Sequence, residues 1–250
     1  MRQYHVAMEK GEVGRYAFLP GNPGRVEKMA RYLDNPVFVR QNREYCCWNG
    51  TLLGETVSIV STGIGGPSAA IAMEELGAIG VDTFIRTGTC GALQPHVGRG
   101  DLIIATASVR GGATANAYVP LSFPAVAHHG MVANLIEAAS KRQYRYTTGI
   151  IQCKDAFFLE DPEKLPRHAK AEEDWETWRR AGVVASEMES DTLFVIASIR
   201  GYRMGTVLVS LGGTAGETEM VGTTADELER LTLCGFEAMK IQILKDRAGA

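Results

Sequence analysis

The sequence has no apolar run approaching the roughly 18 residues that a membrane-spanning helix needs. It has little net charge, −3 from 26 basic and 29 acidic residues, so general nucleic-acid binding is not expected and any anion site must be local. Residues 1–5 lack the apolar stretch of a signal peptide. Cysteine is scarce, and its count of five is odd and without metal-ligand spacing. We therefore expect reduced thiols and a cytoplasmic protein without a membrane or nucleic-acid partner.

Motifs of several enzyme classes are also missing. There is no G-x-x-x-x-G-K pattern, which excludes a P-loop. Residues 63–68, Gly-Ile-Gly-Gly-Pro-Ser, do not fit the G-x-G-x-x-G pattern of dinucleotide-binding folds. No serine or cysteine lies in a nucleophile-elbow sequence, and we expect Cys90 to be a small packing residue in a glycine-rich turn.

What the sequence does contain is an alternation of strand-like and helix-like segments joined by glycine-rich turns. With 250 residues, of which 45% are apolar, the chain can form one sizeable core, and we expect one domain over residues 1–250. The order predicts an α/β sheet with ligands at the carboxyl ends of its strands. Strands are expected at 16–19, 57–61, 83–86, 102–109, 149–153 and 206–210, and helices at 25–33, 67–76, 128–142, 193–200 and 226–245.

Two further segments are expected to be mobile and to cover the ligand site. Residues 159–174 are charged and contain two prolines. Residues 212–224 are rich in glycine and threonine. Both compositions are typical of surface loops that carry function.

The most informative stretch is Ser186-Glu187-Met188-Glu189-Ser190, just before the apolar run 193–197. Acids beside an apolar helix are costly to bury unless something satisfies them. Two carboxylates around one soft apolar side chain suit a ligand with hydroxyl groups and an apolar face, such as ribose. The alternative is an ordinary helix start, with acids near the positive end of the helix dipole.

Two arginine-containing turns are suited to an anion. In residues 21–25, Gly-Asn-Pro-Gly-Arg, a turn leads into a helix whose free N–H groups attract anions, and Arg25 adds donors. In residues 86–89, Arg-Thr-Gly-Thr, an arginine at the end of an apolar strand suits a tetrahedral oxyanion. A surface arginine at a structural turn, and an arginine paired with a nearby acid, remain the alternatives. Arg43 and His5 carry no signal alone.

Taken together, these motifs resemble the nucleoside phosphorylase superfamily, and within it the uridine phosphorylases. The similarity runs from about residue 4 to 210. It is carried by the phosphate loop 20–28, the glycine motif 61–68, the signature turn 86–95 and the ribose motif 187–190. The resemblance implies a single-domain, three-layer α/β/α sandwich with a mixed, twisted and partly barrel-like sheet. It also implies an enzyme, a pentosyltransferase of nucleoside salvage and catabolism.

The resemblance assigns a phosphate site. Gly21, Arg25, Arg86 and Thr89 would hold the phosphate within one subunit, and Arg43 would reach the phosphate of the neighbouring subunit. Phosphate would attack C1′ while the N-glycosidic bond breaks, and its negative charge would stabilise the cationic sugar. No protein nucleophile is needed. The three arginines favour phosphorolysis over the hydrolysis that other superfamily members perform.

The resemblance also assigns the nucleoside contacts. Glu189 would accept hydrogen bonds from the ribose 2′- and 3′-hydroxyls, Met188 would pack on the sugar, and Glu187 would support the site. His5 would reach the 5′-hydroxyl in the neighbouring subunit. Catalysis would depend mainly on Arg86, Glu189 and Arg25. The base would contact Phe157, Lys164 and Leu211.

Assembly and cofactors follow from the same resemblance. The family is usually a homohexamer, a trimer of dimers, with each active site shared within a dimer. We expect no cofactor beyond inorganic phosphate as co-substrate. Some members hold a monovalent cation at the dimer interface, and Glu44, Ile64 and Ser68 match those positions, which would give a structural K⁺ site.

The base pocket departs from the family pattern. Uridine phosphorylases place a Gln and an Arg in the loop after the strand that ends near Lys154, but residues 156–164 contain no Gln and only Lys164 as a cation. Residues 211–213, Leu-Gly-Gly, lack the Asp of bacterial hexameric purine enzymes. We expect uridine as the substrate, with a purine or modified nucleoside as the alternative. A non-catalytic nucleoside-binding protein is a third hypothesis, which Glu189 and the arginines disfavour.

Overall fold

The computed structural model describes residues 1–213 and 222–249, and its strands form one ten-stranded mixed sheet. The strands are β1 Tyr16–Pro20, β2 Asp34–Asn42, β3 Tyr45–Leu52, β4 Glu55–Val60, β5 Thr83–Ala92, β6 Leu102–Gly111, β7 Ala125–Val126, β8 Tyr146–Lys154, β9 Ala185–Glu187 and β10 Arg203–Ser210. The helices are η1 Pro23–Arg25, α1 Val26–Ala30, α2 Gly66–Ala78, α3 Thr114–Tyr118, α4 His129–Lys141, η2 Phe157–Glu160, η3 Pro162–Lys164, α5 His168–Arg180, α6 Ser190–Arg200 and α7 Ala225–Ala248.

The sheet closes on itself around β5. Strand β5 pairs with β10 in parallel and with β9 antiparallel, and β10, β6, β8 and β9 complete a ring of paired strands. On the edge opposite β10, residues 83–87 of β5 pair with β1, from which the sheet continues through β4 and β3 to β2. This ring confirms the predicted mixed, partly barrel-like sheet.

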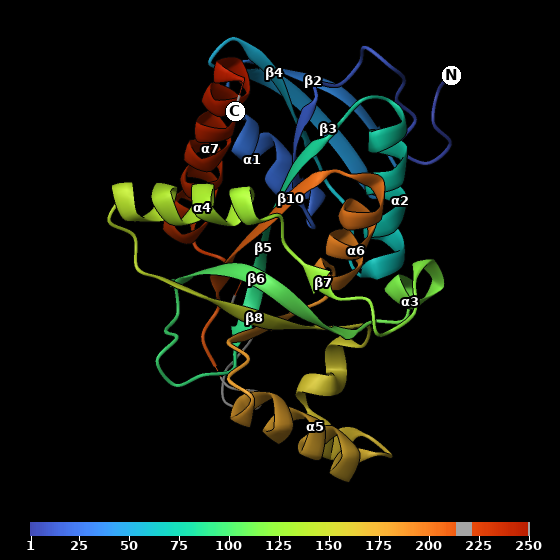
Figure 1. The fold of residues 1–250 in the computed structure, drawn as a ribbon, viewed down its shortest axis with the longest axis vertical. Coiled ribbons are helices and arrows are strands. Elements are labelled where there is room, and N and C mark those ends of the chain that lie inside the picture. The colour runs from blue at the N-terminus through green and yellow to red at the C-terminus, as the bar shows by residue number, and fades with distance from the viewer. Residues whose placement is uncertain (214–221, 250) are drawn as a thin grey trace.

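Helices cover both faces of the sheet. Helices α4 and α7 lie on one side and α2 and α6 on the other (Figure 1). Successive residues of β5 point to opposite faces: Phe84 packs in the core under α2 and α6, and Ile85 in the core that includes Phe236 of α7. Because both faces are covered, β5 and β10 are buried along most of their length, without the alternation of buried and exposed residues that a one-sided sheet shows. The predicted three-layer arrangement is confirmed.

Two predicted elements differ in extent. The prediction that the strand ends in a turn at residues 87–91 is wrong, since β5 continues through Ala92. Pairing with β10 as far as Cys90 and with β9 at Gly91 and Ala92 keeps this stretch extended, which local sequence could not reveal. The helix expected at 25–33 is shorter: it begins as the 3₁₀ turn η1, and α1 ends at Ala30 before the chain turns into β2.

The two expected covering segments have different outcomes. Within 159–174 the chain forms η3 and the first turns of α5, and several of its residues line the cavity described below. Of 212–224, residues 214–221 lie outside the described part of the chain. The five cysteines are free and buried. Within the described residues, no helix combines the length and apolarity needed to cross a bilayer.

A charged cluster holds the end of α7 against the sheet. Asp246 accepts hydrogen bonds from Tyr16 Oη at 2.8 Å and from Arg203 Nη1 at 2.5 Å. Burial raises the pKa of Asp246, but Arg203 and Tyr16 outweigh it and hold the pKa at about 2. Because the folded pKa lies below the unfolded one, this stabilisation is present above about pH 4 and is lost as pH falls towards 2.

We expect Asp246→Asn to lower the free energy of unfolding by about 1–2 kcal/mol at pH 7, measured by urea denaturation. The difference from wild type should shrink below pH 4, where the carboxylate takes up a proton first in the unfolded chain and then, near pH 2, in the folded protein. Asp226→Asn, at the exposed start of the same helix, should cost less than about 0.5 kcal/mol at either pH. An equal loss for Asp246→Asn at pH 7 and pH 3 would contradict the assigned role.

Candidate active site

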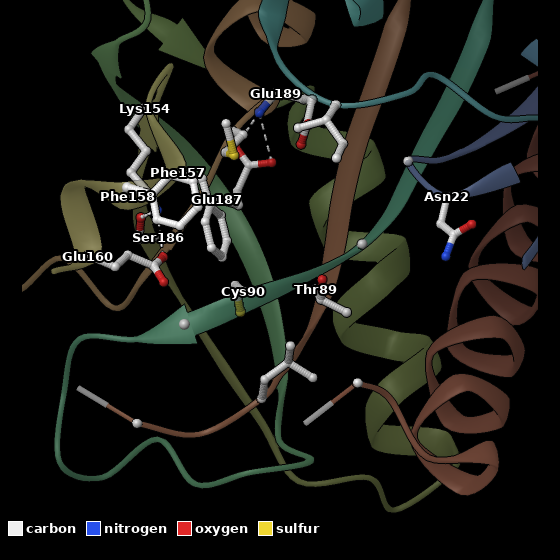
Figure 2. Close-up of a pocket in the computed structure, with 18 of the residues that line it drawn as sticks. Asn22, Thr89, Cys90, Lys154, Phe157, Phe158, Glu160, Ser186, Glu187 and Glu189 are labelled. Atoms are coloured by element: carbon white, nitrogen blue, oxygen red, sulfur yellow. Dashed lines mark hydrogen bonds and ion pairs between the residues drawn. The ribbon is translucent and has the colours of Figure 1, made fainter. Parts of the chain in front are cut away.

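A cavity of about 1220 Å³ opens where β1, β5, β9 and β10 end. It is larger than many ligand pockets, which makes room for more than one small molecule. Its walls come from the loop after β1, the second half of β5, the η2–η3 region, the β9–α6 junction and the chain after β10 (Figure 2). The cavity therefore lies at the carboxyl ends of strands, as predicted.

Glu187 holds the junction between β9 and α6 in place. Its carboxylate accepts hydrogen bonds from the backbone N–H groups of Glu189 at 3.0 Å and Ser190 at 2.7 Å. It also accepts one from Arg86 Nε at 2.9 Å. These contacts occupy a nearly fully buried carboxylate, so its role is to orient its neighbours.

Glu189 lies at the N-cap of α6 and lines the cavity. Its Oε1 accepts a hydrogen bond from Gly65 N at 2.6 Å, and its Oε2 forms an ion pair with Arg86 Nη2. Gly65 has a φ of +90°, a conformation that favours glycine, and this directs its N–H to the carboxylate. Because each carboxylate oxygen can accept more than one hydrogen bond, Glu189 keeps capacity for two ligand hydroxyls.

Arg86 is buried in the middle of β5 but retains a free donor. Its Nε and Nη2 contact the two glutamates, whereas Nη1 is buried and has no hydrogen-bond partner among the described residues. A Cβ at Gly21 would lie 3.9 Å from Nη1, so this donor faces the loop after β1. A Cβ at Gly88 would lie 2.8 Å from Nη2, so glycine is needed for the guanidinium to fold back over β5.

A second positive charge lies beside this free donor. Arg25 ends η1, and burial followed by the like charge of Arg86 lowers the pKa of its guanidinium. No ion pair joins Arg25 to an acid within the described residues. Gly21 and Thr89 line the same part of the cavity. Two arginines with unused donors favour an anion such as phosphate.

The pKa values of the two buried glutamates are shifted in opposite directions. Burial raises the pKa of Glu187, but Arg86 and the N–H groups of Ser190 and Glu189 outweigh it, so the pKa of Glu187 is lowered. For Glu189 burial dominates and the neighbouring Glu187 adds to it, so the pKa of Glu189 is raised despite Arg86. The pKa values of two close carboxylates commonly move apart in this way.

This raised pKa predicts pH-dependent ligand binding. If Glu189 accepts ribose hydroxyls as a carboxylate, uridine affinity should be highest above the raised pKa and should weaken as pH falls through it. We expect uridine affinity to fall by about tenfold per pH unit below the pKa of Glu189. Calorimetric titration without phosphate measures this without interference from phosphate ionisation. Glu189→Gln should bind weakly at every pH, and an equally steep profile in that variant would contradict the assignment.

The opposite end of the cavity holds a buried lysine that sequence reasoning missed. Lys154, the last residue of β8, is 2% exposed, and its Nζ donates to Ser186 Oγ at 2.6 Å and to Glu160 Oε1 at 2.7 Å. Figure 2 shows these three residues on the same side of the pocket as Phe157 and Phe158. A lysine ending a buried strand is costly unless paired, and this signal was available in the sequence.

The predicted base contacts occupy different depths. Phe157 lines the cavity and packs edge-on against Phe158, with ring centroids 5.5 Å apart. Leu211 lines it too, and its N–H donates to Cys90 O at 2.9 Å. Lys164 lies at the rim, with its side chain 82% exposed and paired with Asp161. The inner cation of this end is therefore Lys154.

Arg43 and His5 do not line the cavity of their own chain. Arg43 begins the two-residue turn between β2 and β3, and its guanidinium carbon lies 5.6 Å from the Tyr4 ring centroid. His5 Nδ1 lies 2.7 Å from Glu75 Oε1. The rings of Tyr4 and His5 are 4.8 Å apart, so Tyr4 joins both residues into one surface cluster.

The residues predicted for a cation lie together beside the cavity. Ser68 Oγ lies 2.6 Å from Glu44 Oε1 and 2.5 Å from Thr62 O, and Ile64 is exposed on the adjacent loop. Hydrogen bonding to Ser68 is the main cause of a lowered pKa of Glu44. Carboxylate, hydroxyl and carbonyl oxygens are suitable donors for a hard cation. Within the described residues no group of three His, Cys, Asp or Glu side chains could hold a metal ion.

Comparison with known proteins identifies the family. The family model described as the phosphorylase superfamily matches residues 15–235. The chain belongs to this superfamily. It is 40% identical to a uridine phosphorylase of Treponema pallidum over 98% of this chain and 95% of that protein. It is 43% identical to a uridine phosphorylase of Thermococcus kodakarensis (99% and 90%) and 37% identical to a guanosine phosphorylase of Halorubrum lacusprofundi (91% and 90%).

Membership of the phosphorylase superfamily confirms the family and the fold predicted from the motifs. The chain is an enzyme of the nucleoside phosphorylase type. The structure brings most of the predicted site residues to one cavity. These are Gly21, Arg25, Glu44, Ile64, Ser68, Arg86, Thr89, Phe157, Lys164, Glu187, Met188, Glu189 and Leu211.

Proposed function

We propose that this phosphorylase catalyses the reversible phosphorolysis of uridine to uracil and ribose 1-phosphate. The observation that carries the proposal is the free, buried Nη1 of Arg86 beside the Glu189 carboxylate. One arginine thus offers a donor to phosphate while it holds the acid that would receive the ribose hydroxyls. Uridine is favoured because uridine phosphorylases are similar to this chain over nearly its whole length.

The mechanism follows from where the charges lie. Arg86, Arg25, Gly21 and Thr89 would hold phosphate at the C1′ side of the sugar. Glu189 would fix the ribose through its hydroxyls, and Met188 would pack on it. As the N-glycosidic bond breaks, positive charge develops on the sugar beside the bound phosphate, which stabilises it and then forms the new bond to C1′. The bond electrons leave with the base, and no protein group needs to form a covalent intermediate.

We further propose a cytoplasmic homohexamer built from dimers with shared sites. Support comes from Arg43 and His5, which lie outside the cavity of their own chain and close to each other through Tyr4. In a dimer they would supply a neighbour's phosphate and 5′-hydroxyl contacts. A K⁺ ion at Glu44, Ile64 and Ser68 would stabilise that interface, and no other cofactor is proposed.

A purine nucleoside phosphorylase is the second candidate. Residues 156–164 lack the Gln and the Arg that hold uracil in uridine phosphorylases. The base end of the cavity is formed instead by Lys154, Glu160 and Phe157. A guanosine phosphorylase is also among the similar proteins.

The test is base release from uridine, thymidine and inosine with and without phosphate. Uracil release that requires phosphate would support the proposal. Phosphate-dependent release from inosine alone would replace it with the purine candidate. Tight nucleoside binding without phosphate-dependent turnover would instead indicate a non-catalytic binding protein.

A further inference from the structure

The base end of the cavity contains a connected polar chain. Lys154 Nζ donates to Glu160 Oε1 at 2.7 Å and to Ser186 Oγ at 2.6 Å, and Ser186 Oγ donates to Gln152 Oε1 at 2.6 Å. Gln152 and Ser186 are directly paired residues of β8 and β9. The lysine is therefore fixed on the rigid sheet, and it in turn holds a carboxylate that belongs to η2.

The Glu160 carboxylate is more accessible than its partner. Its side chain is 26% exposed, against 2% for Lys154, and both line the cavity. Its Oε1 faces β5, since a Cβ at Gly91 would lie 3.8 Å from it. Within residues 1–213 and 222–249, Oε2 has no hydrogen bond. The cavity therefore presents an acceptor backed by a buried ammonium group.

The position of this pair relative to the sugar site follows from the chain. Ser186 lies two residues before Met188 and adjoins Glu187, which holds Glu189. Figure 2 shows Glu160 and Ser186 on the side of Phe157 and Phe158, and Glu189 farther from Glu160. A nucleoside with its ribose at Glu189 would extend its base between Phe157 and the Lys154–Glu160 pair.

We propose that the Lys154–Glu160 pair selects nucleosides whose base carries a ring N–H next to a carbonyl. Glu160 accepts the hydrogen bond of the ring N–H, and Lys154 positions Glu160 and places positive charge near the adjacent carbonyl. Uracil, thymine, hypoxanthine and guanine carry this pattern. Cytosine and adenine present an unprotonated ring nitrogen there, which would face the carboxylate without a proton. The inference rests on the proposed phosphorolysis and specifies its substrate class.

Matched nucleosides test this selection. Binding of uridine and 3-methyluridine, and of inosine and 1-methylinosine, is measured by calorimetric titration without phosphate. The methyl group removes the ring N–H donor and adds the volume of one methyl group at the same position. If a parent nucleoside binds, we expect its methylated form to bind about 10- to 100-fold more weakly, because the charged acceptor loses its hydrogen-bond partner. Equal affinity of the methylated and parent nucleosides overturns the proposal.

Variants then assign the effect to the pair. In Glu160→Ala the preference for the parent over the methylated nucleoside should fall to within about threefold, with KM raised more than kcat is lowered. Glu163→Gln removes one negative charge from the same loop at an exposed position that does not line the cavity, and it should keep the wild-type preference. A wild-type preference in Glu160→Ala overturns the proposal.

Lys154→Met tests the positioning role. We expect the preference for the ring N–H to fall by about tenfold while the dependence on ribose hydroxyls, measured with 2′,3′-dideoxyuridine, stays as in wild type. A general loss of structure would reduce both. A Lys154→Met variant that keeps its full preference for the ring N–H overturns the positioning role. If neither uridine nor inosine is cleaved with phosphate, the proposed function fails, whereas the binding ratios still test the selection.

Discussion

Replacing Arg25 with alanine is expected to lower kcat/KM for phosphate by about 10³-fold while the free energy of unfolding stays within about 1 kcal/mol of wild type. The free energy of unfolding should change little because no acid of the described residues pairs with Arg25, so its removal leaves no carboxylate unpaired. Steady-state kinetics at varied phosphate and urea denaturation measure them. The kinetic loss should be specific to phosphate, with uridine binding in its absence nearly unchanged.

Arg86→Ala should cause a comparable kinetic loss with a different stability cost. From the sequence alone, we expect that Arg86→Ala leaves the fold intact. The structure corrects this, because Arg86 pairs with both Glu187 and Glu189, and removing one partner of a buried ion pair costs about 3–5 kcal/mol. Arg86→Lys keeps a charge near the glutamates but loses the guanidinium fork that frees Nη1. It should therefore restore part of the stability and little of the phosphate use.

If Arg25→Ala and Arg86→Lys leave the KM for phosphate unchanged while nucleoside turnover continues, the anion site lies elsewhere. A matched control is Arg145→Ala, which removes a surface guanidinium that pairs with Asp101 and does not line the cavity. It should leave the phosphate kinetics as in wild type.

The ribose and phosphate elements were predictable because local sequence encodes them. Glu187 and Glu189 flank Met188 at a helix start, where acids without partners would be costly, and the structure shows both engaged by Arg86 and backbone N–H groups. Gly65 supplies one of those N–H groups from a conformation that favours glycine. These features are short in sequence, so a motif can carry them.

The remaining features depend on pairings between distant segments. The glycine-rich residues 87–91 were expected to end the strand in a turn, yet β10 and β9 keep them in β5. The position of Lys154 at the end of a buried strand indicates that it must be paired, but its partners, Glu160 and Ser186, come from a loop and another strand. Lys164, chosen as the cation of the loop, lies at the exposed rim. Local sequence does not specify which distant segments pair, and those pairings determine the extent of β5 and the partners of Lys154.

Glu189→Ala gives the second large expected effect, and it tests what the carboxylate recognises. We expect kcat/KM for uridine to fall by about 10³-fold, since two hydrogen bonds to a charged acceptor are lost. The informative comparison is with 2′,3′-dideoxyuridine, which cannot make those bonds. In wild type the two substrates should differ by about 10³-fold, and in Glu189→Ala by less than about tenfold, because the variant has no acceptor left to distinguish them.

This comparison separates recognition from structure, because damage to the fold would lower kcat/KM equally for uridine and for 2′,3′-dideoxyuridine. Glu189→Gln keeps the size of the side chain and one acceptor oxygen, so it should show an intermediate preference for uridine. Glu187→Gln weakens the support of Glu189 without removing the acceptor, and its preference should persist with a lower kcat/KM. If Glu189→Ala retained the full wild-type preference for uridine, the ribose hydroxyls would bind another group, and the buried pair of acids beside Arg86 would serve only to hold the arginine.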